Sequence, residues 1–151
     1  MAGLINDAKE WVADEIADIP KPSADLTDVH IKHATTSAVQ LKSDVTVTNP
    51  YDHELPLIEI TYLLRSNDKE ITSGTLSDVG GVAASAATVT EVMSEVSYDF
   101  LINLMKEIGS DWDIDYDFDV GVKVNLPIVG EFNIPLHKKG CIKLPTLSEL
   151  L

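Results

Sequence analysis

Five aspartates stand at alternate positions in one short stretch, and carboxylates are ligands that Ca²⁺ prefers. They are Asp111, Asp113, Asp115, Asp117 and Asp119. A calcium loop of the EF-hand type beginning at Asp115 needs glycine at its sixth position and glutamate at its twelfth, where this chain has Val120 and Leu126. An extended chain also spreads its carboxylates along a line. The row therefore predicts a solvated acidic face without a specific metal site, and calcium binding is the weaker interpretation.

No other residues have the spacing of a catalytic or cofactor site. His30 and His33 are three apart on an expected strand, so their side chains point to opposite faces. Cys141 has no sequence signature of a nucleophile, and Gly80 and Gly81 lack the Lys-Ser or Lys-Thr of a phosphate-binding loop. We expect no catalytic residue, no cofactor and no enzyme activity.

The element that must position the aspartates is a β-strand. From Trp112 to Val124 every second residue is apolar, which is the period of a strand with one buried and one exposed face. Burial of these apolar side chains contributes roughly 10–20 kcal/mol, whereas repulsion between neighbouring aspartates costs about 1–2 kcal/mol. The apolar side therefore sets the register, the aspartates point outward, and we expect a bend or bulge near Gly121.

Alternation of this kind recurs along the chain and predicts a sheet protein. Strands are expected at 26–31, 39–47, 58–64, 70–75 and 89–96, and after the acidic strand at 132–136 and 142–144. Residues 77–87 are expected to form a loop and residues 138–140 a turn. Helical spacing from Phe100 to Ile108, followed by Gly109, predicts one short inserted helix. The fold class is therefore mostly β, an antiparallel β-sandwich of about seven strands in two sheets.

The first residues have a helical period instead. An apolar stripe runs through residues 3–19, at Ile5, Ala8, Val12, Ile16 and Ile19, widened by Leu4 and Trp11. Pro20 and Pro22 end it. We expect an N-terminal amphipathic helix and linker over residues 1–22 and one sandwich domain over residues 23–151. Two interpretations of the helix stay open: it docks on, or frays from, the sandwich, or it binds a partner or a membrane.

Composition narrows the possible partners and the compartment. The 151 residues carry a net charge of −14, which argues against nucleic acid and against anionic membrane surfaces. A single cysteine excludes an internal disulfide framework and is typical of a reducing compartment. The acidic first residues do not have the shape of a signal peptide. We expect a cytoplasmic protein, kept monomeric by mutual repulsion.

Three stretches together resemble one protein family. Residues 45–51 read VTVTNPY, residues 109–116 read GSDWDIDY, and residues 125–135 read NLPIVGEFNIP, followed by KKGCIKLPTLSELL. They resemble the group 2, or atypical, late embryogenesis abundant proteins of plants, which carry the water-stress and hypersensitive-response (WHy) domain, and in particular their small single-domain cytosolic members. The motif residues, interpreted as structural, are Asn49, Pro50, Tyr51, Trp112, Asp113, Ile114, Asp115, Tyr116 and Gly130.

The resemblance implies a fibronectin-III-like sandwich with one helix, and a non-enzymatic protein that accumulates under desiccation, cold, salt or wounding. It supplies no catalytic residue. The 44% apolar content and the strand periodicity predict a folded chain rather than a disordered one. We expect a soluble acidic shield for client proteins or membranes under stress, with the five aspartates as its candidate surface. The alternative is a binding module whose sandwich holds a partner protein or an apolar or lipid ligand.

Overall fold

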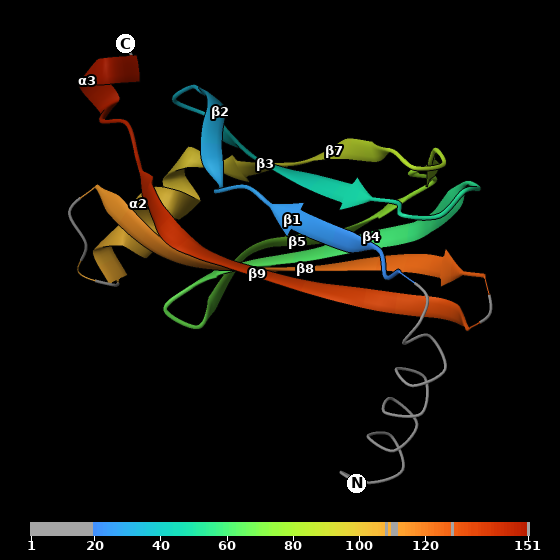
Figure 1. Cartoon of the computed structure of the whole chain (residues 1–151). Coiled ribbons are helices and arrows are strands. Elements are labelled where there is room, and N and C mark those ends of the chain that lie inside the picture. Colours follow the sequence, from blue (N-terminus) through green and yellow to red (C-terminus); the bar gives the residue numbers. More distant parts are fainter. Residues whose placement is uncertain (1–19, 108, 110–111, 128, 151) are drawn as a thin grey trace, which may run out of the picture.

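Two antiparallel β-sheets pack face to face in the computed structural model, which describes residues 20–107, 109, 112–127 and 129–150 (Figure 1). The first sheet contains β1 (Ser23–Leu26), β2 (His30–Ala34), β3 (Ala38–Thr48) and β7 (Ala87–Ser97). The second contains β4 (Leu55–Ser66), β5 (Lys69–Ser77), β6 (Gly81–Val82), β8 (Asp113–Leu126) and β9 (Gly130–Lys143). The prediction of a mostly β fold with two antiparallel sheets is confirmed. The helix expected over residues 3–19 lies outside the described residues, as does Asp111.

The core lies between the sheets, and β8 contributes most to it. Its inward side chains are all 4% exposed or less; they are Ile114, Tyr116, Phe118, Val120, Val122, Val124 and Leu126. This is the register that the alternation predicts. Of the bend or bulge expected near Gly121, the bulge is wrong, because β8 pairs with β9 in unbroken register and the irregularity opposite β8 falls in β4, between Leu57 and Glu59.

The strand expected over residues 26–31 is interrupted at residues 27–29, where side chains enter the hydrogen bonding. The Thr27 N–H still donates to the Asp44 carbonyl oxygen at 3.0 Å, while the hydroxyl of Ser43 donates to the Thr27 carbonyl oxygen at 2.7 Å and the Asp44 N–H to Thr27 Oγ1 at 2.8 Å. The Val29 N–H donates to the phenol oxygen of Tyr116 in the other sheet at 2.8 Å. The ladder with β3 is thus broken after Thr27, and β1 and β2 lie separately along the same edge of β3.

The turn expected at residues 138–140 is wrong, since β9 runs straight through it. Gly140 stands opposite Tyr116 of β8. A Cβ atom on Gly140 would lie 2.5 Å from the Tyr116 phenol oxygen, far inside van der Waals contact. Gly140 is therefore the site over which the Tyr116 side chain lies, and not the mark of a chain reversal.

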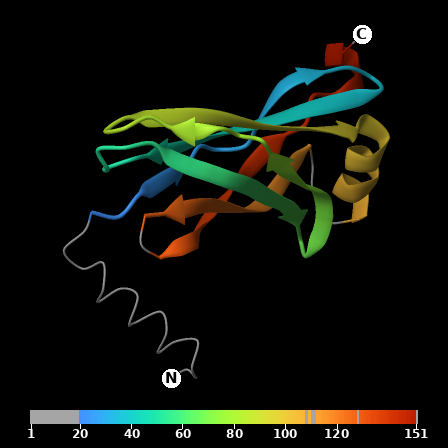
Figure 2. The same ribbon diagram turned by 90° about the vertical axis from the view of Figure 1, so that its right-hand side faces the viewer.

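Two helices follow strands in the described part of the chain, one after β7 and one after β9. Helix α2 (Tyr98–Glu107) is the inserted helix that the spacing predicts; the Phe100 N–H donates to Ser97 Oγ at its start, and Leu101 and Leu104 enter the core. It covers one end of the sandwich (Figures 1 and 2). Helix α3 (Leu147–Leu150) was not expected. The Glu149 side chain caps its start, since Glu149 Oε1 accepts from both the N–H and the hydroxyl of Thr146, and the Glu149 N–H donates to the Thr146 carbonyl.

Candidate functional surface

The aspartate row lies on the outer face of the second sheet. Asp113 and Asp115 are exposed, whereas Asp117 and Asp119 are half-buried. Each faces a residue of β9 across the ladder: Lys143, Cys141, Lys139 and His137 stand opposite Asp113, Asp115, Asp117 and Asp119 in that order. On the other side of β8, Arg65 of β4 stands opposite Asp117. The row is therefore set between two strands that carry basic side chains.

The half-buried aspartates make ion pairs with these side chains. Arg65 Nη2 lies 2.7 Å from Asp119 Oδ2, and His137 Nδ1 lies 2.5 Å from Asp119 Oδ1. Asp117 Oδ1 lies 3.4 Å from His137 Nε2 and 3.8 Å from Lys139 Nζ. The hydrogen bond from His137, and then that from Arg65, holds the pKa of the Asp119 carboxyl below its ordinary value. We call this set, Arg65, Asp117, Asp119, His137 and Lys139, the charge ladder.

The expectation of a fully solvated acidic row fits only Asp113 and Asp115. Sequence reasoning missed the cations because their positions depend on the pairing of β4, β8 and β9. A readable signal did exist: His137, Lys139 and Lys143 follow a period of two, like the aspartates, which is the pattern expected of a strand that pairs with the acidic one.

The exposed thiol in this face is poorly suited to react as a thiolate. Burial raises the pKa of the Cys141 thiol, and the negative charges of Asp113 and Asp115 raise it further. In the part of the chain that the structure describes, no three side chains of His, Cys, Asp or Glu come together so as to hold a metal ion.

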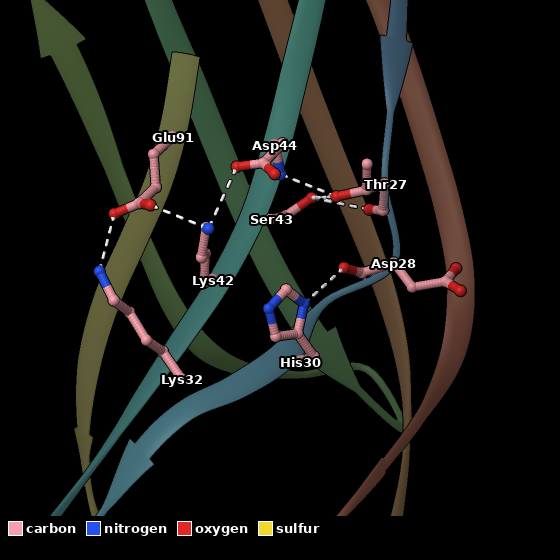
Figure 3. A network of polar contacts seen from close by, with 8 residues as sticks. All are labelled: Thr27, Asp28, His30, Lys32, Lys42, Ser43, Asp44 and Glu91. Atoms are coloured by element: carbon pink, nitrogen blue, oxygen red, sulfur yellow. Dashed lines mark hydrogen bonds and ion pairs between the residues drawn. The ribbon is translucent and has the colours of Figure 1, made fainter. Parts of the chain in front are cut away.

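The outer face of the first sheet carries a second set of mixed charges (Figure 3). Glu91 of β7 lies 3.0 Å from Lys42 and 3.4 Å from Lys32, and Lys42 also approaches Asp44 at 3.8 Å. The Glu91 hydrogen bond is the main cause that raises the pKa of Lys42, and the Lys42 hydrogen bond is the main cause that lowers the pKa of Glu91. Both broad faces of the sandwich thus satisfy many of their charges within the chain.

Exposed carboxylates without a neighbouring cation remain both on these two faces and at the turns of the described chain. Among the described residues, the exposed carboxylates that make no ion pair within 4.0 Å include Glu54, Asp68, Asp78, Glu95, Asp99 and Glu131. Glu54, Asp68, Asp78 and Asp99 lie in turns or at the ends of elements, whereas Glu95 and Glu131 lie at outward positions of β7 and β9. The unpaired acid is therefore spread over turns, element ends and outward strand positions, including Asp113 and Asp115 of β8.

Asn49, a residue of the sequence motif, is buried, and its side chain joins the two sheets by hydrogen bonds. Its side chain is 1% exposed, and its Nδ2 group donates to the carbonyl oxygens of His53 at 2.8 Å, Val82 at 3.0 Å and Ala83 at 3.1 Å. Its Oδ1 accepts from the Tyr51 N–H at 2.9 Å. One side chain thus links the end of β3 in the first sheet to β6 in the second.

Three other motif residues, Pro50, Trp112 and Gly130, lie at or next to the ends of strands. Pro50 follows the end of β3. Trp112 precedes β8 with a φ of 67°; its N–H donates to Met105 Sδ at 2.9 Å, and its carbonyl accepts from the Leu144 N–H at 2.6 Å. Gly130, with a φ of 87°, opens β9 after the β8–β9 turn.

The cavities offer little room for a ligand inside the fold. The cavity between the sheets, lined by residues such as Val29, Leu41, Tyr62 and Phe118, has a volume of about 10 Å³, about that of one water molecule. A shallow open hollow of about 420 Å³ lies between His53 and Glu54 on one side and Pro127 and Val129 on the other.

Within the residues that the structure covers, no helix has the length and hydropathy needed to span a bilayer.

Comparison with known proteins points to one family. The family described as "Late embryogenesis abundant protein" matches residues 44–140. Over 150 residues the chain is 47% identical to "Late embryogenesis abundant protein Lea14-A" of Gossypium hirsutum and 45% identical to "Desiccation protectant protein Lea14 homolog" of Glycine max, with 99% of both chains covered in each case. The solution structure of an Arabidopsis thaliana protein, 42% identical, covers 100% of both chains with a TM-score of 0.70.

Proposed function

The chain belongs to the late embryogenesis abundant family, and on that premise we propose that it is a non-enzymatic stress-response protein that protects cell components during desiccation, cold, salt stress or wounding. The names of two relatives, a late embryogenesis abundant protein and a desiccation protectant, support this function. We propose further that it acts as a soluble acidic shield, which separates other proteins as they become concentrated.

The distribution of charge is the observation that carries the shield. Most cations of the described residues on the two broad faces are engaged by the chain's own acids, as with Arg65 on Asp119 and Lys42 on Glu91. The charges left for a neighbouring molecule are mainly carboxylates, at turns and at outward strand positions. Such a surface repels acidic proteins and offers few strong contacts to any other protein.

The shield acts at short range. Repulsion between separated surfaces is screened within about 10 Å at 0.1 M salt and within about 3 Å at 1 M. Because salt becomes concentrated as water is lost, the long-range part of the repulsion fades during drying. What remains is the water held by the exposed carboxylates, together with the volume of the folded sandwich.

The candidate surface in this proposal remains the row of Asp111, Asp113, Asp115, Asp117 and Asp119. Its described members have different roles. Asp117 and Asp119 hold the charge ladder, whereas Asp113 and Asp115 present exposed charge. The alternative, a binding module for a partner protein or an apolar or lipid ligand, is not favoured by the names of the relatives. The cavity between the sheets has only about 10 Å³, whereas ligand pockets are commonly about 300–1,000 Å³, and the hollow of about 420 Å³ beside Pro127 is shallow and open.

Several finer expectations belong to the same proposal. We place the chain in the atypical group 2 with a WHy domain and a fibronectin-III-like sandwich, with an amphipathic helix and linker over residues 1–22 and the domain over residues 23–151. The protein would be a cytoplasmic monomer without a cofactor or a specific metal, would not bind nucleic acid, and would act on client proteins or membranes under stress.

Drying an enzyme that is sensitive to water loss together with this protein tests the shield. In the neutralised variant Glu54→Gln, Glu95→Gln, Asp99→Asn and Glu131→Gln remove four carboxylates without a neighbouring cation. In the matched control the same positions keep their charge as Glu54→Asp, Glu95→Asp, Asp99→Glu and Glu131→Asp. We expect the control to protect like the natural chain and the neutralised variant to protect less. Equal protection by both, or by an inert protein of equal net charge, would contradict the shield.

A further inference from the structure

The inward face of β9 is less covered than that of its neighbour β8. Phe132, Ile134 and Leu136 point toward the core but remain half-buried, whereas the inward side chains of β8 are 4% exposed or less. Since β9 is the last strand of its sheet, it has a neighbour on one side only. One flank of the hydrophobic core is therefore incompletely covered along this strand.

Strand β1 of the first sheet lies beside β9 and borders the same incompletely covered flank (Figure 1). Its apolar residues Ala24 and Leu26 are likewise half-buried and pack against the core. We call the five side chains the β1–β9 seam: Ala24, Leu26, Phe132, Ile134 and Leu136. The seam is an apolar strip between the edges of the two sheets.

Polar contacts bridge the two sheets at other places on the flanks. Beyond the seam, the Val29 N–H bonds to the Tyr116 phenol, and Lys138 Nζ lies 3.6 Å from Asp28 Oδ1. On the opposite flank, the hydroxyls of Thr72 in β5 and Ser94 in β7 lie 2.6 Å apart. The seam therefore lies in the half of its flank nearer the β8–β9 turn.

The described part of the chain begins at Pro20, close to one end of the seam. Ser23, the first residue of β1, pairs with Thr48 at the end of β3, and Pro22 is buried just before it. The sequence before Pro20 carries the apolar stripe that includes Val12 and Ile16. As a helix, these residues would span about 25 Å at 1.5 Å per residue, and the distance along β9 from Phe132 to Leu136 is about 13 Å.

We propose that residues 4–19 form a helix that docks its apolar stripe on the β1–β9 seam. The occupant belongs to the chain itself because the tether is only three residues long, from Pro20 to Pro22, and reaches the protein where the seam begins. The faces of such a helix are defined by 100° per residue, so Val12 and Ile16 face the seam and Ala13 and Ala17 face solvent. This would place most of the acidic residues of the segment outward.

A disulfide trap in the full-length chain tests the contact. With Cys141→Ser as background, Val12→Cys combined with Ile134→Cys should form an intramolecular disulfide under mild oxidation, whereas Ala17→Cys combined with Ile134→Cys should not. Failure of the first pair, or equal reaction of both pairs, overturns the proposal. A predominantly intermolecular disulfide overturns it as well, because the occupant would then be a second copy.

Hydrogen exchange gives a measurement that leaves the sandwich sequence untouched. The variant Val12→Asp with Ile16→Asp should raise the exchange rate of amides in residues 131–137 by about fivefold or more, through loss of cover over the edge. The matched control Ala13→Asp with Ala17→Asp adds the same charge on the other face and should leave the rates unchanged. Unchanged rates in the first variant, or equal increases in both, would contradict docking.

Discussion

The phenol oxygen of Tyr116 accepts a hydrogen bond of 2.8 Å from the backbone N–H of Val29, which lies between β1 and β2 and is 87 positions away in the sequence. Both residues are buried. The bond ties the Val29 N–H to the other sheet, and the same tyrosine side chain lies over Gly140 of β9. Tyr116 of β8 therefore contacts both β9 and the segment between β1 and β2, and burial raises the pKa of its phenol.

Removal of this phenol oxygen should destabilise the fold. Tyr116→Phe leaves the buried Val29 N–H without its partner, which costs about 1–3 kcal/mol. Urea denaturation measures the change in the free energy of unfolding. Tyr62→Phe is the matched control, because Tyr62 also lies over a glycine, Gly74, from a neighbouring strand, and no phenol hydrogen bond joins it to another described residue. A loss as large in the control would show that the ring environment, and not the Val29 bond, matters.

Asn49 should tolerate neither truncation nor charge. Asn49→Ala removes the partner of three carbonyls and one N–H and should cost about 2–4 kcal/mol. Asn49→Asp places a carboxylate oxygen toward the carbonyls of His53, Val82 and Ala83, so it should be at least as destabilising at pH 7 and recover in part when acid protonates it. Denaturation at pH 7 and pH 4 distinguishes these effects. Asn125→Ala, at an exposed position, should change little.

Gly140 should accept no larger residue while Tyr116 is present. Gly140→Ala brings a methyl group to 2.5 Å from the Tyr116 phenol oxygen and 2.7 Å from the ring, and such overpacking costs about 1–3 kcal/mol. If the contact is the cause, the loss should be smaller when Gly140→Ala is made in a Tyr116→Leu background. Denaturation of the four proteins of this cycle gives the coupling directly, and strict additivity would contradict the interpretation.

Acid should weaken the charge ladder. The pKa of Asp119 is lowered in the folded protein by His137 and Arg65, so its contribution is present above the unfolded value, near 4, and is lost as pH falls through the folded value. Asp119→Asn should therefore reduce the loss of stability between pH 5 and pH 2. Urea midpoints across this range measure the effect. Asp115→Asn, whose carboxylate forms no ion pair with a described residue, serves as the control and should follow the natural chain.

The thiol of Cys141 should react slowly near neutral pH. Burial and the charges of Asp113 and Asp115 raise the pKa of the thiol, so little thiolate is present at pH 7.5. Asp115→Asn removes one of these charges and should speed alkylation by neutral iodoacetamide about twofold to threefold. The rate measured as a function of pH provides the check. Asp119→Asn, farther along β8, should have little effect, and an equal acceleration by both variants would contradict the local cause.

The sequence predicts those elements whose pattern is complete within one segment. Strand β8 follows from its own alternation, and helix α2 from its spacing and the cap at Ser97. The turn predicted near Gly140 of β9 is wrong because the reason for that glycine lies in Tyr116, a residue of another strand. The break between β1 and β2 has the same origin, since the Val29 bond is invisible until the sheets are packed.

The candidate surface shows the same limit. The aspartates could be found, yet the charge that they present depends on Arg65 from one neighbouring strand and on His137 and Lys139 from another. Pairing register is set by packing and turns, which a single segment does not contain. Helix α3 is a different case, because its cap, made by Glu149 on Thr146, is a local signal and could have been recognised.

The charge ladder has a consequence for a protein that must remain folded as its solvent disappears. Opposite charges already in contact, such as Arg65 with Asp119 and Lys139 with Asp117, attract about four times more strongly when the effective dielectric constant falls from 80 to 20. A row of aspartates without partners would repel more strongly by the same factor. Evaporation therefore tightens the cross-strand pairing of β4, β8 and β9 on this face, in conditions where the hydrophobic effect loses the water on which it depends.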